Sequence, residues 1–122
     1  MKKSMIVAFL MLLIHLPVVC AAEFQQGNLF KIKLVSEHET VQCEYYSPDT
    51  YQCEKNGYSL DEKQARRELS LLFHQLHLRH DVKVEEMVHS LEKTGYNNVK
   101  FLDVRWMDSH HRLFTWIWEK DE

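Results

Sequence analysis

The feature that most limits what this chain can fold into is the order of residue types at its N-terminus. Two lysines precede an apolar run that ends near Leu16, and small residues follow. This order is typical of a cleavable secretory signal peptide, and cleavage after Ala21 or after Ala22 fits it equally well. We therefore expect a signal peptide over residues 1–22 and one folded domain over residues 23–122.

Two other fates of the N-terminal segment remain open. The apolar run is short for a membrane span of about 20 residues and contains His15, which disfavours a retained anchor. Lipidation of Cys20 would require leucine three residues earlier and a small residue directly before it, but Pro17 and Val19 hold those positions. Release into the periplasm or the medium is the favoured interpretation, and the sequence does not separate these two destinations.

The size and charge of the exported part bound its function. About 100 residues suffice for one hydrophobic core and no second domain. None of the 18 acidic residues and two of the 15 basic residues lie in the signal segment, which leaves a net charge of −5. Because the chain has no basic stripe, neither nucleic acid nor an anionic lipid surface is an expected ligand.

Two cysteines remain after the signal segment, Cys43 and Cys53. In an exported protein such a pair predicts a disulfide. The chain-entropy model gives about 2.5–3 kcal/mol of stabilisation for a loop this short. A thiolate metal site is disfavoured, because no second close cysteine pair exists.

Alternating apolar residues predict strands in both halves of the domain. Phe30, Ile32 and Leu34 alternate with lysines, which indicates a strand with one buried face. Cys43 and Cys53 fall on the buried faces of the next two strands, and an odd loop length would place them directly opposite each other. Two further strands close the chain, over about 99–107 and 113–118, with a turn at 108–112 between them.

Two amphipathic helices are predicted between these groups of strands. The first covers about 60–79, with Ser59 as N-cap and Glu62 completing a capping box. Asp81 can cap the second, and Gly95 ends it as a left-handed C-cap. Their apolar positions recur at helical spacing: Leu69, Leu72, Phe73 and Leu76 in the first helix, and Val84, Met87, Val88 and Leu91 in the second.

The resulting order, β-β-β-α-α-β-β, predicts an α+β domain. We expect a small antiparallel sheet with two helices on one face and one disulfide. The order of the strands within the sheet does not follow from the sequence.

Histidines on the two helices suggest a metal-binding alternative. His77 and His80 recur in the first helical region beside His74, and His89 follows on the second helix. Such ligands suit zinc or copper, so an extracytoplasmic metal-binding protein that uses His77, His80 and His89 is the second hypothesis. Histidines on a helix flank are more often ordinary amphipathic residues, so no cofactor is expected in the leading hypothesis.

The segment Asp108-Ser109-His110-His111 contains the residue types of an acyl-transfer triad. Consecutive residues at a hairpin tip point in divergent directions, whereas catalytic triads are assembled in space on a rigid support. No catalytic residue is therefore assigned. A small hydrolase is only a third hypothesis, and we expect a protein that is not an enzyme.

Surplus apolar surface points to a protein partner. Two helices can cover only one face of a small sheet, yet the last strand is apolar on both faces. We predict that a partner-binding patch uses some of these side chains: Trp106, Phe114, Trp116, Trp118, Leu71 and Leu78. Exposed tryptophans could also stack on sugar rings, so a glycan ligand stays open. The leading hypothesis is a small secreted or periplasmic binding module of the inhibitor, immunity or envelope-accessory type.

Overall fold

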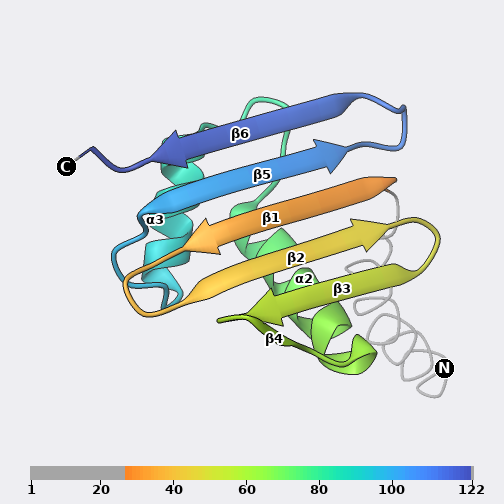
Figure 1. Ribbon diagram of the computed structural model, residues 1–122. Helices are drawn as coiled ribbons and strands as arrows, with labels where there is room; N and C mark the ends of the chain where they lie inside the picture. Colours follow the sequence, from red (N-terminus) through yellow and green to blue (C-terminus); the bar gives the residue numbers. More distant parts are fainter. Residues whose placement is uncertain (1–26, 122) are drawn as a thin grey trace, which may run out of the picture.

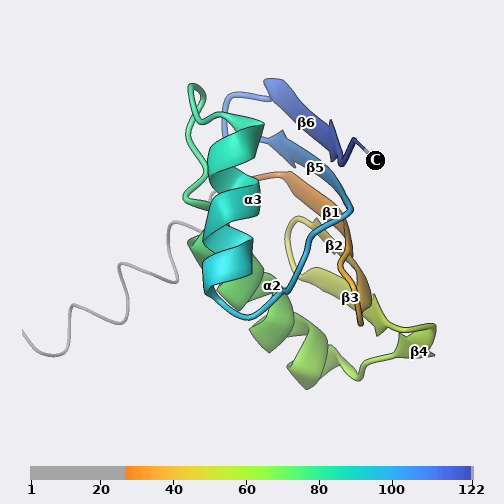
Figure 2. The ribbon, with the colours of Figure 1, turned by 90° about the vertical axis from the view of Figure 1, so that its left-hand side faces the viewer.

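Alternation of apolar and polar residues produces an antiparallel sheet in the computed structural model, which describes residues 27–121. The signal peptide prediction therefore lies outside the described residues. The sheet has six strands in the order β4-β3-β2-β1-β5-β6, and both helices lie on one face of it (Figures 1 and 2). The elements are β1 (Leu29–Val35), β2 (Thr40–Tyr46), β3 (Thr50–Lys55), β4 (Tyr58–Ser59), α2 (Glu62–Leu76), α3 (Val84–Lys93), β5 (Phe101–Met107) and β6 (Leu113–Glu119). The predicted α+β class, with two helices on one face, is confirmed.

The central strand β1 shows how the pattern of residues becomes a two-sided sheet. Phe30, Ile32 and Leu34 are at most 3% exposed and face the helices, whereas Lys31 and Lys33 point to the other face. Side chains alternate strictly along a strand, so each neighbouring strand repeats this division. The strand pairs with β2 on one side and with β5 on the other, both antiparallel.

The hairpin of β2 and β3 carries the predicted disulfide. Cys43 and Cys53 are direct partners in the ladder, with Cα atoms 4.1 Å apart, and they are bonded through their sulfur atoms. Both side chains are buried on the helix side. The predicted disulfide, and the direct opposition of its two cysteines across the ladder, are therefore confirmed.

A short strand that the sequence did not predict follows this hairpin. Asn56 and Gly57 have φ values of 52° and 83°, the left-handed conformations that a two-residue hairpin turn requires. The chain then returns as β4, which pairs with β3 through Tyr58 and Ser59. Two residues are too few to display an alternating pattern.

The ends of helix α2 differ from the expected ones. Asp61, not Ser59, is the N-cap: its carboxylate accepts from the backbone N–H of Gln64 at 2.8 Å, and the Gln64 side chain accepts from the Asp61 N–H at 3.4 Å. The predicted capping box was therefore displaced by two residues, because Ser59 is part of β4. The helix ends at Leu76 rather than near 79, because His77 adopts a left-handed conformation with φ 51°.

Helix α3 begins at Val84, two residues later than an Asp81 cap would require. Asp81 instead forms an ion pair with Arg79 at 3.1 Å. The C-terminus agrees with the prediction: Gly95 has φ 120°, and the Tyr96 N–H donates to the Leu91 carbonyl at 3.2 Å. This bond runs from the second residue after the cap to the third residue before it, as in a Schellman motif.

The core lies between the helices and one face of the sheet (Figure 2). Its fully buried side chains come from both layers: Phe30, Leu34, Val41, Tyr45, Leu69, Leu72, Leu76, Met87, Leu91, Val99, Leu102 and Val104. Burial of each large apolar side chain contributes about 1.5–3 kcal/mol, so this layer accounts for most of the stability. The two helices leave the other face of the sheet uncovered.

Candidate interaction surface

The helices leave one face of the sheet uncovered, here called the open face; Figure 1 looks onto it. Its side chains are the alternate residues that do not enter the core. They include Lys31, Lys33, Gln42, Glu44, Gln52, Glu54, Asp103, Arg105, Leu113, Thr115 and Ile117. Strand register places them in rows across five strands, so they form one continuous surface.

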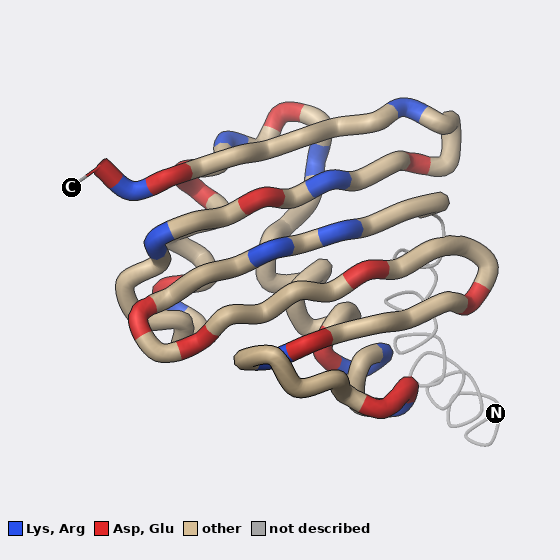
Figure 3. The backbone as a smooth tube through the Cα atoms, in the orientation of Figure 1, with Lys and Arg blue, Asp and Glu red and all other residues tan. Residues whose placement is uncertain are grey.

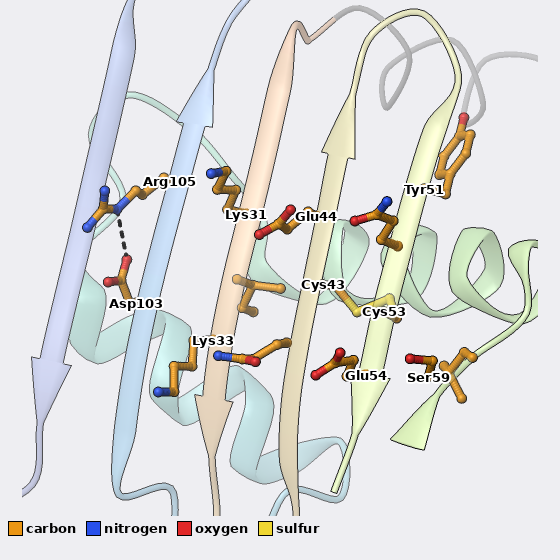
Figure 4. A pocket seen from close by; sticks show the side chains of 14 residues that line it. Lys31, Lys33, Cys43, Glu44, Tyr51, Cys53, Glu54, Ser59, Asp103 and Arg105 are labelled. Atoms are coloured by element: carbon orange, nitrogen blue, oxygen red, sulfur yellow. Dashed lines mark hydrogen bonds and ion pairs between the residues drawn. A yellow bond between two sulfur atoms is a disulfide. The ribbon is translucent and has the colours of Figure 1, made fainter. Parts of the chain in front are cut away.

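Basic side chains occupy the middle of the open face (Figures 3 and 4). Lys31 lies directly opposite Arg105 across the β1–β5 ladder, and Lys33 is two residues further along β1. Arg105 bonds to Asp103 at 3.3 Å, but no carboxylate within residues 27–121 lies within 4.0 Å of either lysine nitrogen. A hydrogen bond with Tyr46 raises the pKa of Lys31.

A shallow depression of about 670 Å³ runs from this basic centre towards β3 (Figure 4). Glu44 and Glu54 line its far side, on β2 and β3. Glu44 is the ladder partner of Lys31, so opposite charges meet along the boundary between β1 and β2. A ligand in this depression would meet carboxylates on one flank and ammonium groups on the other.

The open face becomes apolar at its β6 end. Leu113 and Ile117 are 55% and 57% exposed, and Thr115 lies between them on the same face. Figure 3 shows that β6 carries no charged residue until Glu119. The predicted partner-binding residues did not include Leu113 or Ile117. The alternation in β6 separates these two side chains from the aromatic ones, but it does not by itself show which of the two faces the helices leave uncovered.

The predicted aromatic patch lies on the helix side of the sheet. The Trp116 indole N–H donates to the Val82 carbonyl at 2.8 Å, and the Phe114 ring stacks on His80 with centroids 4.4 Å apart. Trp106, Trp118 and Leu78 are partly buried against the core, whereas Leu71 is 51% exposed on α2. Most of this set therefore packs within the domain, and its role in partner binding stays a prediction.

The turn between β5 and β6 is built around the buried carboxylate of Asp108. It accepts from the backbone N–H groups of His110 and Arg112 at 2.9 and 3.0 Å, from the Arg112 guanidinium at 3.0 Å, and bonds to His80 Nε2 at 3.1 Å. Burial would raise the pKa of Asp108, but the two backbone N–H groups and the guanidinium outweigh it and lower the pKa to about 2. The Asp108 carboxylate therefore stabilises the turn, and the His80 imidazole that bonds to it lies in the α2–α3 loop.

The structure does not gather the three histidines of the metal hypothesis. His77 ends α2, His80 bonds to Asp108, and His89 is exposed on α3. Within residues 27–121 no group of three or more histidine, cysteine, aspartate or glutamate side chains is arranged to hold a metal ion. Zinc or copper binding gains no support from the geometry and stays a prediction.

Comparison with models of known families, with curated proteins and with solved structures finds no match to this chain. In the part of the chain that the structure describes, neither helix combines the length and apolar character that a membrane crossing needs.

Proposed function

We propose that this protein is an exported binding module that acts by holding a protein partner against its open face. An inhibitor, an immunity-type protein or an envelope accessory protein would act in this way. One observation carries the proposal: the open face combines a basic centre with exposed apolar side chains. Lys31 and Lys33 form the basic centre, and the apolar side chains are Leu113 and Ile117. Protein interfaces combine these two kinds of contact.

The charges favour a partner that presents carboxylates to β1 and apolar side chains to β6. Lys31 and Lys33 have no ion-pair partner among residues 27–121, so a docked carboxylate would not have to displace an existing one. The mixed signs along the depression favour a folded protein over a uniformly charged polymer. The disulfide is weakly consistent with an extracytoplasmic setting.

The test is affinity capture with the full chain, expressed in an exporting host and purified with its disulfide intact. The captured protein is then purified, and its affinity is compared for two matched double variants. Lys31→Glu with Lys33→Glu reverses both charges of the basic centre. Lys63→Glu with Lys93→Glu makes the same change of charge on the helix layer.

We expect the β1 double variant to weaken binding at least about tenfold at low salt, with a smaller loss at high salt, because charge pairs steer association. The helix-layer variant should bind like the wild type. Equal binding by both variants would show that the open face is not the docking surface. An empty capture from a folded bait would remove the binding-module proposal itself.

A further inference from the structure

The β6 strand offers apolar side chains and also backbone groups that have no partner strand within residues 27–121. It is the last strand of the sheet, and the described chain places no strand beyond it. The Asp108 N–H bonds to the Arg112 carbonyl, and the Lys120 N–H bonds to the Lys100 carbonyl, both at 3.0 Å. Because these groups alternate in direction along an antiparallel strand, the residues whose backbone polar groups point away from β5 are Leu113, Thr115, Ile117 and Glu119.

This edge lacks the usual devices that prevent strands from pairing. β6 pairs with β5 without a bulge over all seven residues, and it contains neither proline nor an internal charge. The opposite edge differs from it, since β4 is only two residues long and pairs with only the last two residues of β3. A long, regular and apolar edge strand is a template for another strand.

The sequence of β6 is nearly self-complementary about Thr115. When two copies run antiparallel with Thr115 facing Thr115, Leu113 faces Ile117 on the open face and Phe114 faces Trp116 on the helix side. Each residue thereby meets one of similar size and polarity, and cross-strand pairs of this kind stabilise a ladder. The arrangement has a twofold axis, so each contact occurs twice.

The neighbouring register is less complementary. Centring the pair on Trp116 would place Leu113 opposite Glu119, and it would bring Arg112 opposite Lys120. The first pair buries an apolar side chain against a charge, and the second opposes two positive charges. The Thr115 register avoids both conflicts.

We propose that two copies of this chain associate through β6, antiparallel and centred on Thr115, to form one continuous sheet. Both open faces then lie on the same side, and the Leu113 and Ile117 side chains of the two copies form one apolar strip across the axis. This inference goes beyond the proposed function. Lys31 and Lys33 lie two strands away from the shared edge, so partner binding and self-association are separately testable.

The first test is cysteine cross-linking in the full chain. Thr115→Cys places two thiols directly opposite each other in a hydrogen-bonded pair, where Cα atoms are about 5.5 Å apart. A disulfide spans about 4.4–6.8 Å between Cα atoms, so mild oxidation should give a covalent dimer. Ile117→Cys should cross-link only when mixed with Leu113→Cys, because the thiol at 117 faces position 113 of the other copy. The wild-type chain, oxidised in the same way, controls for cross-linking through the cysteines that the protein already contains.

The second test measures the mass of the disulfide-intact protein by sedimentation over a range of concentrations. We expect the wild type to reach the dimer mass. Thr115→Lys should weaken association at least about fivefold, because two like charges then lie directly opposite each other. Thr115→Val is the matched control and should associate like the wild type. Circular dichroism establishes that each variant is folded.

A wild-type chain that stays monomeric at its solubility limit would overturn the proposal. Cross-linking of Ile117→Cys with itself, in preference to Thr115→Cys, would overturn the register. Neither result would affect capture of a partner through the basic centre. Conversely, an empty capture would leave a dimer mass and a Thr115 cross-link fully interpretable.

Discussion

The β2–β3 hairpin and the β5–β6 hairpin lie on opposite sides of β1, and different interactions hold their strands together. In the β2–β3 hairpin, the Cys43–Cys53 disulfide joins directly opposed residues, and β4 extends the sheet beyond it. The β5–β6 hairpin has no covalent link. Its turn is held by Asp108, and its outer strand is anchored to the α2–α3 loop by Trp116.

The comparison indicates that the interactions that hold a hairpin in register are separate from those that decide whether its outer strand is exposed. The disulfide joins β2 and β3 directly, and the two-residue β4 pairs with only Glu54 and Lys55 of β3. The β5–β6 hairpin depends on buried polar contacts and aromatic packing on the helix side. Its exposed open-face side chains Leu113 and Ile117 take no part in these contacts. The hairpin without the covalent link is the one whose outer strand we propose as the contact between two copies.

The largest expected effect comes from removing the covalent link. Replacing both Cys43 and Cys53 by alanine should lower the free energy of unfolding by about 2.5–3 kcal/mol, because the unfolded chain regains the freedom of the closed loop. Urea unfolding at a fixed protein concentration measures this loss.

The three tryptophans report on the other hairpin during the same experiment, since Trp106, Trp116 and Trp118 all lie in β5 or β6. Their native fluorescence should match that of the wild type before unfolding begins. A changed native spectrum would show that the β5–β6 hairpin depends on the disulfide, and the two hairpins would then not be independent. An unchanged stability would contradict the assigned role of the bridge.

A smaller effect is expected from the anchor of the non-covalent hairpin. Trp116→Phe keeps an aromatic ring in place but removes the 2.8 Å hydrogen bond to the Val82 carbonyl, which should cost about 1–2 kcal/mol. The matched control is Trp118→Phe, since no described residue accepts a hydrogen bond from the Trp118 indole. Urea unfolding should show a smaller loss for the control. Equal losses would mean that ring volume, rather than the hydrogen bond, anchors β6.

The disulfide hairpin was more predictable from sequence than the β5–β6 hairpin, for a physical reason. Local alternation of apolar and polar residues predicts that Cys43 and Cys53 lie on the buried faces of their strands. The spacing between the two cysteines predicts that they pair. The polar contacts of Asp108 with His80 join segments 28 residues apart, and no local pattern encodes them. The same alternation identified the two faces of β6, but it did not reveal which face the helices would cover.

Helix ends were the least predictable local features. Both Ser59 and Asp61 are good N-cap residues, and only the formation of β4 decides between them. His77 ends α2 in a conformation that histidine adopts less readily than glycine, so no residue at this position predicts the end of the helix. The candidate surface was partly predictable: an uncovered apolar face was expected, but its basic centre depends on the β1–β5 register.

The smallest expected effect on the free energy of unfolding comes from the charge of Asp108 in the β5–β6 turn, and it depends on pH. The pKa of Asp108 is about 2 in the folded protein, below the ordinary value of about 3.9. A lowered pKa means that the ionised carboxylate stabilises the fold above about pH 4, and that this stabilisation is lost as the pH falls towards 2.

Asp108→Asn removes the charge while keeping a carbonyl oxygen that can accept from the turn N–H groups. The wild type should therefore be the more stable protein at pH 5–7, and the difference should shrink steadily below about pH 4. Urea unfolding of both proteins between pH 7 and pH 2.5 measures this difference. If the difference stayed constant across that range, shape rather than charge would hold the turn, and the two hairpins would differ only in whether their link is covalent.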